Sequence, residues 1–172
     1  MDPLHTTFMS PFDESSLGAV SRRLSEAVFT SLPQLRRYAH VAKSGELDGL
    51  SLIVTVPSPT GNSDRQFVIW VDEISAPSIG FGPSHAHESN DAGGIALIVD
   101  LAGRILDDTL LIIEDVGGKY PGHSSWIDLR KVNALEEELT SPYSPGCALL
   151  KSWSGKGDRQ VSMENLGAEA LE

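Results

Sequence analysis

Two stretches of alternating side chains constrain the fold of this chain more than any other feature. Leu50–Val56 places Leu50, Leu52, Val54 and Val56 on one face, and Gln66–Asp72 alternates in the same way. Residues 58–64, between them, are dense in Pro, Gly, Asn, Asp and Ser, which favour turns. Because a period of two is typical of strands, the pattern predicts a β-hairpin.

Helical spacing appears on both sides of this hairpin. Apolar residues from Ile95 to Leu106 recur at intervals of three and four, and Asn90 or Asp91 stands where a capping side chain is expected. A second amphipathic helix is predicted from Ser15 or Ser16 to about Leu32, a further helical piece over 34–42, and a small acidic helix around 132–139.

The remaining apolar runs are short enough to be strands. One is predicted to run from Ile79 to the histidines at 85 and 87, and others cover 109–116, 147–153 and 160–163. The sequence therefore predicts an α+β fold, with an antiparallel sheet of five or six strands and helices packed mainly on one face. We expect a single domain over 15–163, a flexible N-terminal arm over 1–14 and a frayed tail over 164–172.

The net charge of the chain indicates which kinds of partner it can bind. The chain has 172 residues, 40% of them hydrophobic, and carries a net charge of −11. Such a charge repels nucleic-acid phosphates and anionic membranes, and it favours a basic protein as the partner. The N-terminus lacks a basic segment followed by an apolar one, no apolar run is long enough for a membrane span, and Cys147 is the only cysteine. We therefore expect a cytoplasmic protein without an internal disulfide.

The strongest chemical signal is the pair His85 and His87. Side chains at i and i+2 of a strand point to the same face, so the two imidazoles could share a metal ion, a proton or a partner's charge. A catalytic zinc site needs a third protein ligand. The nearby candidates are Asp72, Glu73, Glu88, Asp91 and His123, and none stands at a diagnostic spacing.

Two enzyme families place a His-x-His motif beside a glycine-rich strand end. The segment 79–87 resembles the metal-binding strand of JAMM-type metalloproteases, but Glu88 stands where that family has proline, and Ile98 lies near the position of its ligating aspartate. Cupins also use His-x-His, and Pro121-Gly122-His123 resembles their later histidine motif. However, the predicted helix over 93–106 has no counterpart in a cupin barrel.

A third resemblance is to small acidic bacterial immunity proteins of toxin–immunity systems. It rests on an N-terminal amphipathic helix, strands that end near His-x-His, a covering helix and the late Ser152-Trp153-Ser154-Gly155 segment, and it spans roughly residues 50–155. The resemblance implies a protein that neutralises a toxin by covering its active surface, without a reaction or cofactor of its own.

We therefore predict a non-enzymatic, acidic protein-binding module whose partner is a basic protein. Aromatic and charged side chains near the predicted hairpin are the candidate contacts: His85, His87, Asp72, Glu73, Glu88 and Trp70. The alternative is a metal-dependent hydrolase or metal-binding protein that holds zinc through His85 and His87. A third hypothesis is a structural subunit that associates with its own copies through a strand edge.

Overall fold

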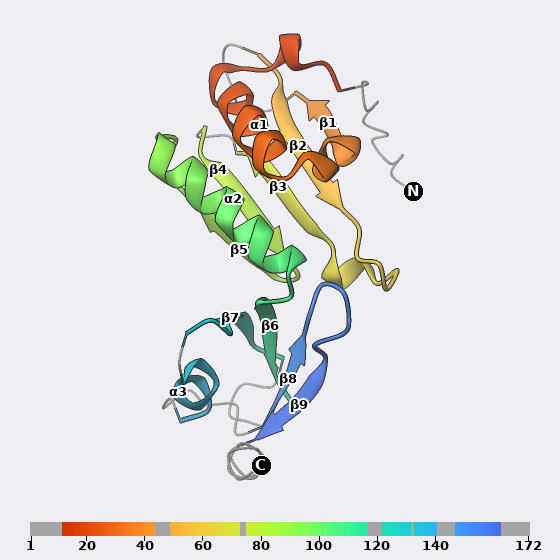
Figure 1. The fold of residues 1–172 in the computed structure, drawn as a ribbon, viewed down its shortest axis with the longest axis vertical. Coiled ribbons are helices and arrows are strands. Elements are labelled where there is room, and N and C mark those ends of the chain that lie inside the picture. Colours follow the sequence, from red (N-terminus) through yellow and green to blue (C-terminus); the bar gives the residue numbers. More distant parts are fainter. Residues whose placement is uncertain are drawn as a thin grey trace, which may run out of the picture. The chain divides into compact units, whose positions relative to one another are not determined.

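The chain divides into two compact units that interleave along the sequence. The computed structural model describes residues 12–43, 49–72, 75–116, 122–131, 133–140 and 147–162 (Figure 1). The first unit comprises Met1–Val56, Val68–Gly80 and Ala86–Asp100, and the second comprises Pro57–Phe67, Phe81–His85 and Leu101–Glu172.

A five-stranded sheet in the order β1-β2-β3-β4-β5 forms the framework of the first unit. Its strands are β1 (Ala39–Ala42), β2 (Ser51–Val56), β3 (Phe67–Val71), β4 (Pro77–Phe81) and β5 (Ser84–His87). Helix α1 (Ala19–Ser31) follows a short 3-10 helix, η1 (Glu14–Ser16), and α2 (Ala92–Leu106) follows β5. Both helices lie over the same face of the sheet (Figure 1).

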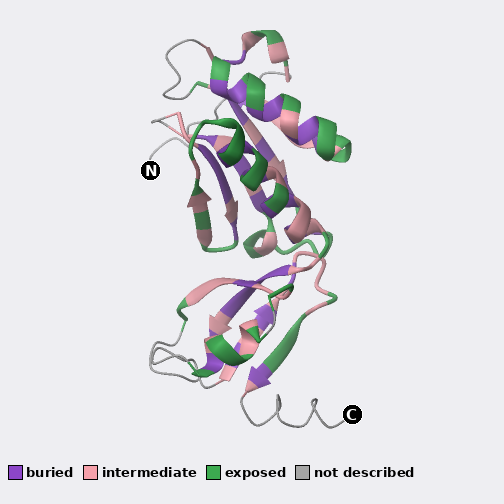
Figure 2. Cartoon of the chain, turned by 60° about the vertical axis from the view of Figure 1, so that its left-hand side comes forward, coloured by how far each residue is buried: buried purple, intermediate pink, exposed green. Residues whose placement is uncertain are grey.

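The covering helices are amphipathic because their apolar residues recur at helical spacing. Val20, Leu24 and Val28 of α1 are buried, and buried and exposed positions alternate around the helix (Figure 2). Asp91 caps α2 by accepting a hydrogen bond from the Gly94 N–H at 2.9 Å. That bond, with one from the side chain of Ser89, holds the pKa of Asp91 below its usual value.

A second sheet, in the order β7-β6-β8-β9, forms the second unit. Its strands are β6 (Leu110–Asp115), β7 (Ser124–Asp128), β8 (Cys147–Lys151) and β9 (Arg159–Ser162), all paired antiparallel. Helix α3 (Ala134–Thr140) packs on one face. The core between them is apolar and consists of Leu111, Ile113, Ile127, Leu139, Ala148, Leu150 and Val161.

The predicted α+β class with antiparallel strands is confirmed, and the strands are shared between two sheets of five and four. The hairpin strands and the helix up to Leu106 lie where their patterns place them. The sequence predicts a single domain over 15–163. The structure divides the chain into the two compact units given above.

Two local predictions are wrong. The helix expected over 34–42 is a 3-10 helix, η2 (Pro33–Tyr38), followed by β1, because pairing with β2 outweighs local helix preference. The single strand expected from Ile79 to His87 is a hairpin, β4 and β5. Its turn is Gly82-Pro83, where Gly82 has a φ of 60°, a conformation that favours glycine.

The predicted arm and tail lie largely beyond the described residues. Residues 1–11 and the tail over 164–172 are outside the described part of the chain. The described end of the arm is packed on the first unit, since the ring of Phe12 lies edge to face against Phe29 at 5.5 Å between centroids. In the described residues, no helix has the length and apolar character that crossing a bilayer requires.

Candidate functional site

The face of the five-stranded sheet opposite α1 and α2 is the most distinctive surface of the first unit. Along β2 and β3, buried residues alternate with half-buried ones, so Ile53, Thr55, Val68 and Trp70 point away from the helices. His40 of β1 pairs with Ile53 and therefore points the same way. We call these five residues the open face; α1 and α2 both lie over the other face of the sheet (Figure 1).

Trp70 contacts a histidine that is hydrogen-bonded to two further side chains. The rings of Trp70 and His87 meet edge to face, with centroids 6.1 Å apart. The Nδ1 atom of His87 lies 3.0 Å from Oδ2 of Asp72 and 2.7 Å from Oγ of Ser78. Because an ionised carboxylate only accepts, contact with Asp72 favours the proton on Nδ1 and fixes the orientation of the ring. We call Trp70, Asp72, Ser78 and His87 the His87 cluster.

Local backbone structure explains why Asp72 is available to His87. Asp72 follows β3, and its Oδ1 atom accepts a hydrogen bond from the Ala76 N–H at 2.8 Å, which ties together the two ends of the β3–β4 connection. Its other oxygen, Oδ2, lies 3.0 Å from Nδ1 of His87. Ser78 is fully buried on β4, and its hydroxyl donates to the carbonyl of Ala76 at 3.1 Å. Both partners of the imidazole are thus held by the backbone.

The His87 cluster contains serine, histidine and aspartate, but it does not have the geometry of a nucleophilic relay. In such a relay, one ring nitrogen contacts the hydroxyl and the other contacts the acid. Here Asp72 and Ser78 lie at the same nitrogen of His87, and the hydroxyl is buried where a substrate cannot reach it. The arrangement suits a fixed recognition surface better than acyl transfer.

The structure brings together three of the six residues predicted from the sequence: Trp70, Asp72 and His87. His85 is exposed on β5, and Glu88 is half-buried, with its backbone N–H donating to the carbonyl of Pro77 at 2.9 Å. Glu73 lies outside the described residues. Ser78 was missed; the one signal for it is a small polar residue between Pro77 and Ile79 in an apolar strand.

The zinc hypothesis for His85 and His87 stays a prediction. Among the residues that the structure describes, no three His, Cys, Asp or Glu side chains gather closely enough to hold a metal ion. His87 already has Asp72 at its Nδ1 atom.

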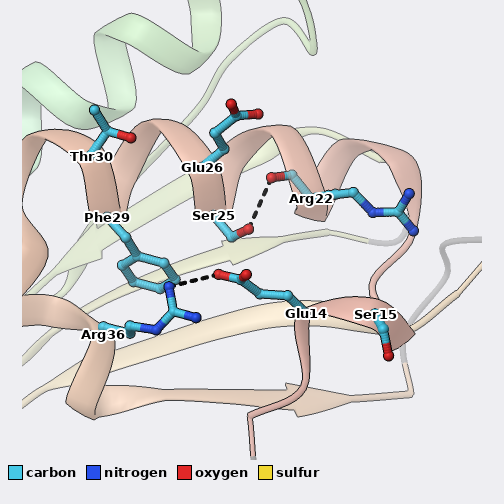
Figure 3. A pocket seen from close by; sticks show the side chains of 8 residues that line it. All are labelled: Glu14, Ser15, Arg22, Ser25, Glu26, Phe29, Thr30 and Arg36. Atoms are coloured by element: carbon cyan, nitrogen blue, oxygen red, sulfur yellow. Dashed lines mark hydrogen bonds and ion pairs between the residues drawn. The ribbon is translucent and has the colours of Figure 1, made fainter.

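A hollow of the first unit lies along α1 and is lined mostly by polar side chains (Figure 3). Three of its charged side chains, Glu14, Arg22 and Arg36, make contacts within the protein. Arg36 forms an ion pair with Glu14 at 2.9 Å and lies over the ring of Phe29, and Arg22 donates to the carbonyl of Leu17 at 2.8 Å. These contacts fasten η1 and η2 to the helix, which is a structural role.

Comparison with known proteins gives no match to this chain among family models, curated proteins or solved structures.

Proposed function

We propose that this chain is a non-enzymatic protein-binding module that holds a basic protein partner on the open face of its first unit. The observation that carries the proposal is Trp70, a large aromatic side chain on an open face, held edge to face by an imidazole that Asp72 and Ser78 orient. Tryptophan is enriched among the residues that dominate binding energy at interfaces.

Rigidity supports this role. A side chain that is ordered before binding loses less conformational freedom when a partner arrives, so more of its contact energy contributes to affinity. Trp70 lies in a sheet, between the half-buried Val68 and the turn that Asp72 stabilises. Ile53 and Val68 add apolar area around it, as expected for the centre of an interface with a polar rim.

Charge supports the choice of partner. The chain has 24 acidic and 13 basic side chains, and its net charge of −11 attracts a basic surface and raises the rate of encounter at low salt. A basic toxin domain is one partner of this kind. The resemblance to immunity proteins favours it, and inhibition would then follow from coverage of the toxin's active surface.

Affinity capture with matched variants tests the proposal. Wild-type protein, Trp70→Ala and Leu97→Ala would be immobilised and exposed to a lysate of the producing cell at low and high salt. Leu97 is the control because it is 39% exposed on α2, on the helix-covered side of the sheet. We expect the wild type and Leu97→Ala to retain a basic protein that high salt releases, and Trp70→Ala to lose it. Equal retention by all three proteins, or no retained protein, would refute the proposal.

A further inference from the structure

A cleft in the second unit contains charged groups that are not fully paired within the protein. It encloses about 470 Å³, which is within the range of small-molecule sites. Its walls come from the 3-10 helix η3 (Ser63–Arg65), the Gly82-Pro83 turn, and strands β6, β7 and β8. Four ionisable side chains line it: Asp64, Arg65, Glu114 and Lys151.

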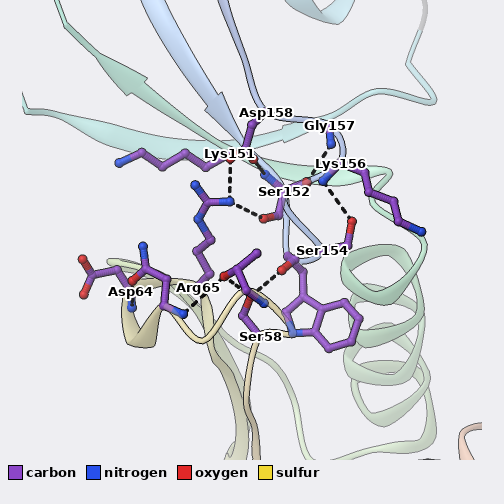
Figure 4. Close-up of polar contacts among 12 residues, drawn as sticks. Ser58, Asp64, Arg65, Lys151, Ser152, Ser154, Lys156, Gly157 and Asp158 are labelled. Atoms are coloured by element: carbon purple, nitrogen blue, oxygen red, sulfur yellow. Dashed lines mark hydrogen bonds and ion pairs between the residues drawn. The ribbon is translucent and has the colours of Figure 1, made fainter.

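Arg65 uses only one corner of its guanidinium group within the protein. Its Nη1 atom lies 2.6 Å from Oδ2 of Asp158 and 3.4 Å from the carbonyl oxygen of Ser152. Its Nε atom is buried and has no hydrogen-bond partner, and Nη2 makes no bond to any residue that the structure describes. In Figure 4 the Nη1 corner is turned toward Ser152 and Asp158, while the other edge faces the side of Asp64 and Lys151.

The unused edge of Arg65 can hold one oxygen of a carboxylate. Because Nε is inaccessible, a ligand reaches this edge at Nη2, whose N–H groups can donate to a carboxylate oxygen. A buried donor left without a partner is unfavourable. Since the side chain is only 15% exposed and Asp158 fixes its position, the edge is held ready for a ligand.

The other charges of the cleft select the ligand further. Glu114 and Lys151 form an ion pair with each other. The carboxylate of Asp64 is exposed and bonds to no residue in the described part of the chain. The cleft therefore presents one unused cationic edge and one unused carboxylate. A purely anionic ligand meets repulsion from Asp64, whereas a ligand with both charges satisfies both groups.

We propose that this cleft binds a small zwitterion of the free α-amino acid class. The carboxylate of the ligand accepts hydrogen bonds from Nη2 of Arg65, and its ammonium group is attracted by Asp64. This is a binding site, separate from the protein-binding function proposed above, and it involves no reaction.

Nuclear magnetic resonance of the Arg65 side chain tests the inference directly. The full-length protein would be titrated with L-alanine, acetate and methylammonium, while the Nε–H signal of Arg65 and the backbone amides are observed. We expect L-alanine to shift the Nε–H signal with saturation, and each single-function compound to bind at least about tenfold more weakly. No shift with L-alanine at millimolar concentration, or equal affinity for acetate, would overturn the proposal.

Three variants separate binding from folding. Arg65→Lys keeps the charge but removes the planar edge, and it is expected to lose L-alanine binding. Arg159→Lys, at an exposed position of β9, is the matched control and is expected to bind like the wild type. If Arg65→Lys unfolds, the variant Asp64→Asn tests the proposal instead. Asp64 is exposed, and the hydrogen bond that it makes among the described residues comes from its backbone N–H. It is expected to weaken L-alanine binding and leave acetate binding unchanged or stronger; unchanged L-alanine binding would contradict the assignment.

Discussion

Asp128, at the end of β7, provides a quantitative test of how the second unit is held together. Its Oδ2 atom forms an ion pair with Arg104 of α2 at 2.7 Å, and the two side chains are only 11% and 13% exposed. Its Oδ1 atom accepts bonds from the backbone and side chain of Arg130. Burial raises the pKa of Asp128, but the bonds from Arg130 and the charges of Arg104 and Arg130 outweigh it and hold the pKa below the usual 3.8.

The variant Asp128→Asn removes the charge and keeps the shape. Hydrogen bonds to charged groups contribute about 1.5–3 kcal/mol each when they are shielded from water. Since asparagine still accepts a bond from Arg104, we expect a loss of about 2 kcal/mol in the free energy of unfolding at pH 7. Because the folded pKa is lowered, the stabilisation is fully present above pH 3.8 and disappears as the pH falls through the folded value.

Urea denaturation at pH 7, 5 and 3 measures this difference, with amide protection of β6, β7 and β8 as the readout for the second unit. The control is Glu137→Gln, which removes an exposed carboxylate from α3. We expect the gap between wild type and Asp128→Asn to be constant from pH 7 to 5 and to shrink at pH 3. A gap below about 0.5 kcal/mol at pH 7, or one that does not depend on pH, would refute the reasoning.

Four further outcomes are expected. Gly94→Ala should destabilise the protein by about 2 kcal/mol or more in thermal unfolding, because a Cβ there would overlap the backbone oxygen of Ser89. Gly103→Ala in the same helix should stabilise it by about 0.5–1 kcal/mol, because the added methyl group meets no atom; a reversed order would count against the packing described. Ser78→Ala should cost about 1 kcal/mol and broaden the His87 ring signals in NMR spectra, and unchanged spectra would show that the hydroxyl does not orient the ring. Protein purified without a histidine tag should contain no stoichiometric zinc, whereas bound zinc that His87→Ala removes would favour the metal-binding alternative.

Secondary structure could be predicted from the sequence where the hydrophobic pattern of a segment determines its conformation. The alternating strands over 50–56 and 66–72 and the helical stripe that ends at Leu106 each bury one face, so their periods were visible in the residues alone. The 34–42 segment could not be predicted in this way, because its last four residues are a strand only through pairing with β2.

The candidate site was predictable only in part for the same reason. His87, Asp72 and Trp70 stand out as residue types, but their meeting depends on how β3, β4 and β5 lie together in one sheet. For Ser78, the sequence shows only a small polar residue in an apolar strand, and its role becomes visible when the sheet places it beside His87. Arg65 and Asp158 are 93 positions apart, and neither has a neighbour in the sequence that indicates their ion pair.

The location of the contact in a captured complex tests the central claim most directly. A photo-crosslinking residue would be placed at Thr55, on the open face, and in a second protein at Leu97, on α2, before each is exposed to the lysate and illuminated. We predict that Thr55 crosslinks a basic protein in high yield at low salt and that Leu97 does not. A crosslink from Leu97 alone, or none from Thr55 while the partner is retained, would contradict the assignment of the open face as the binding surface.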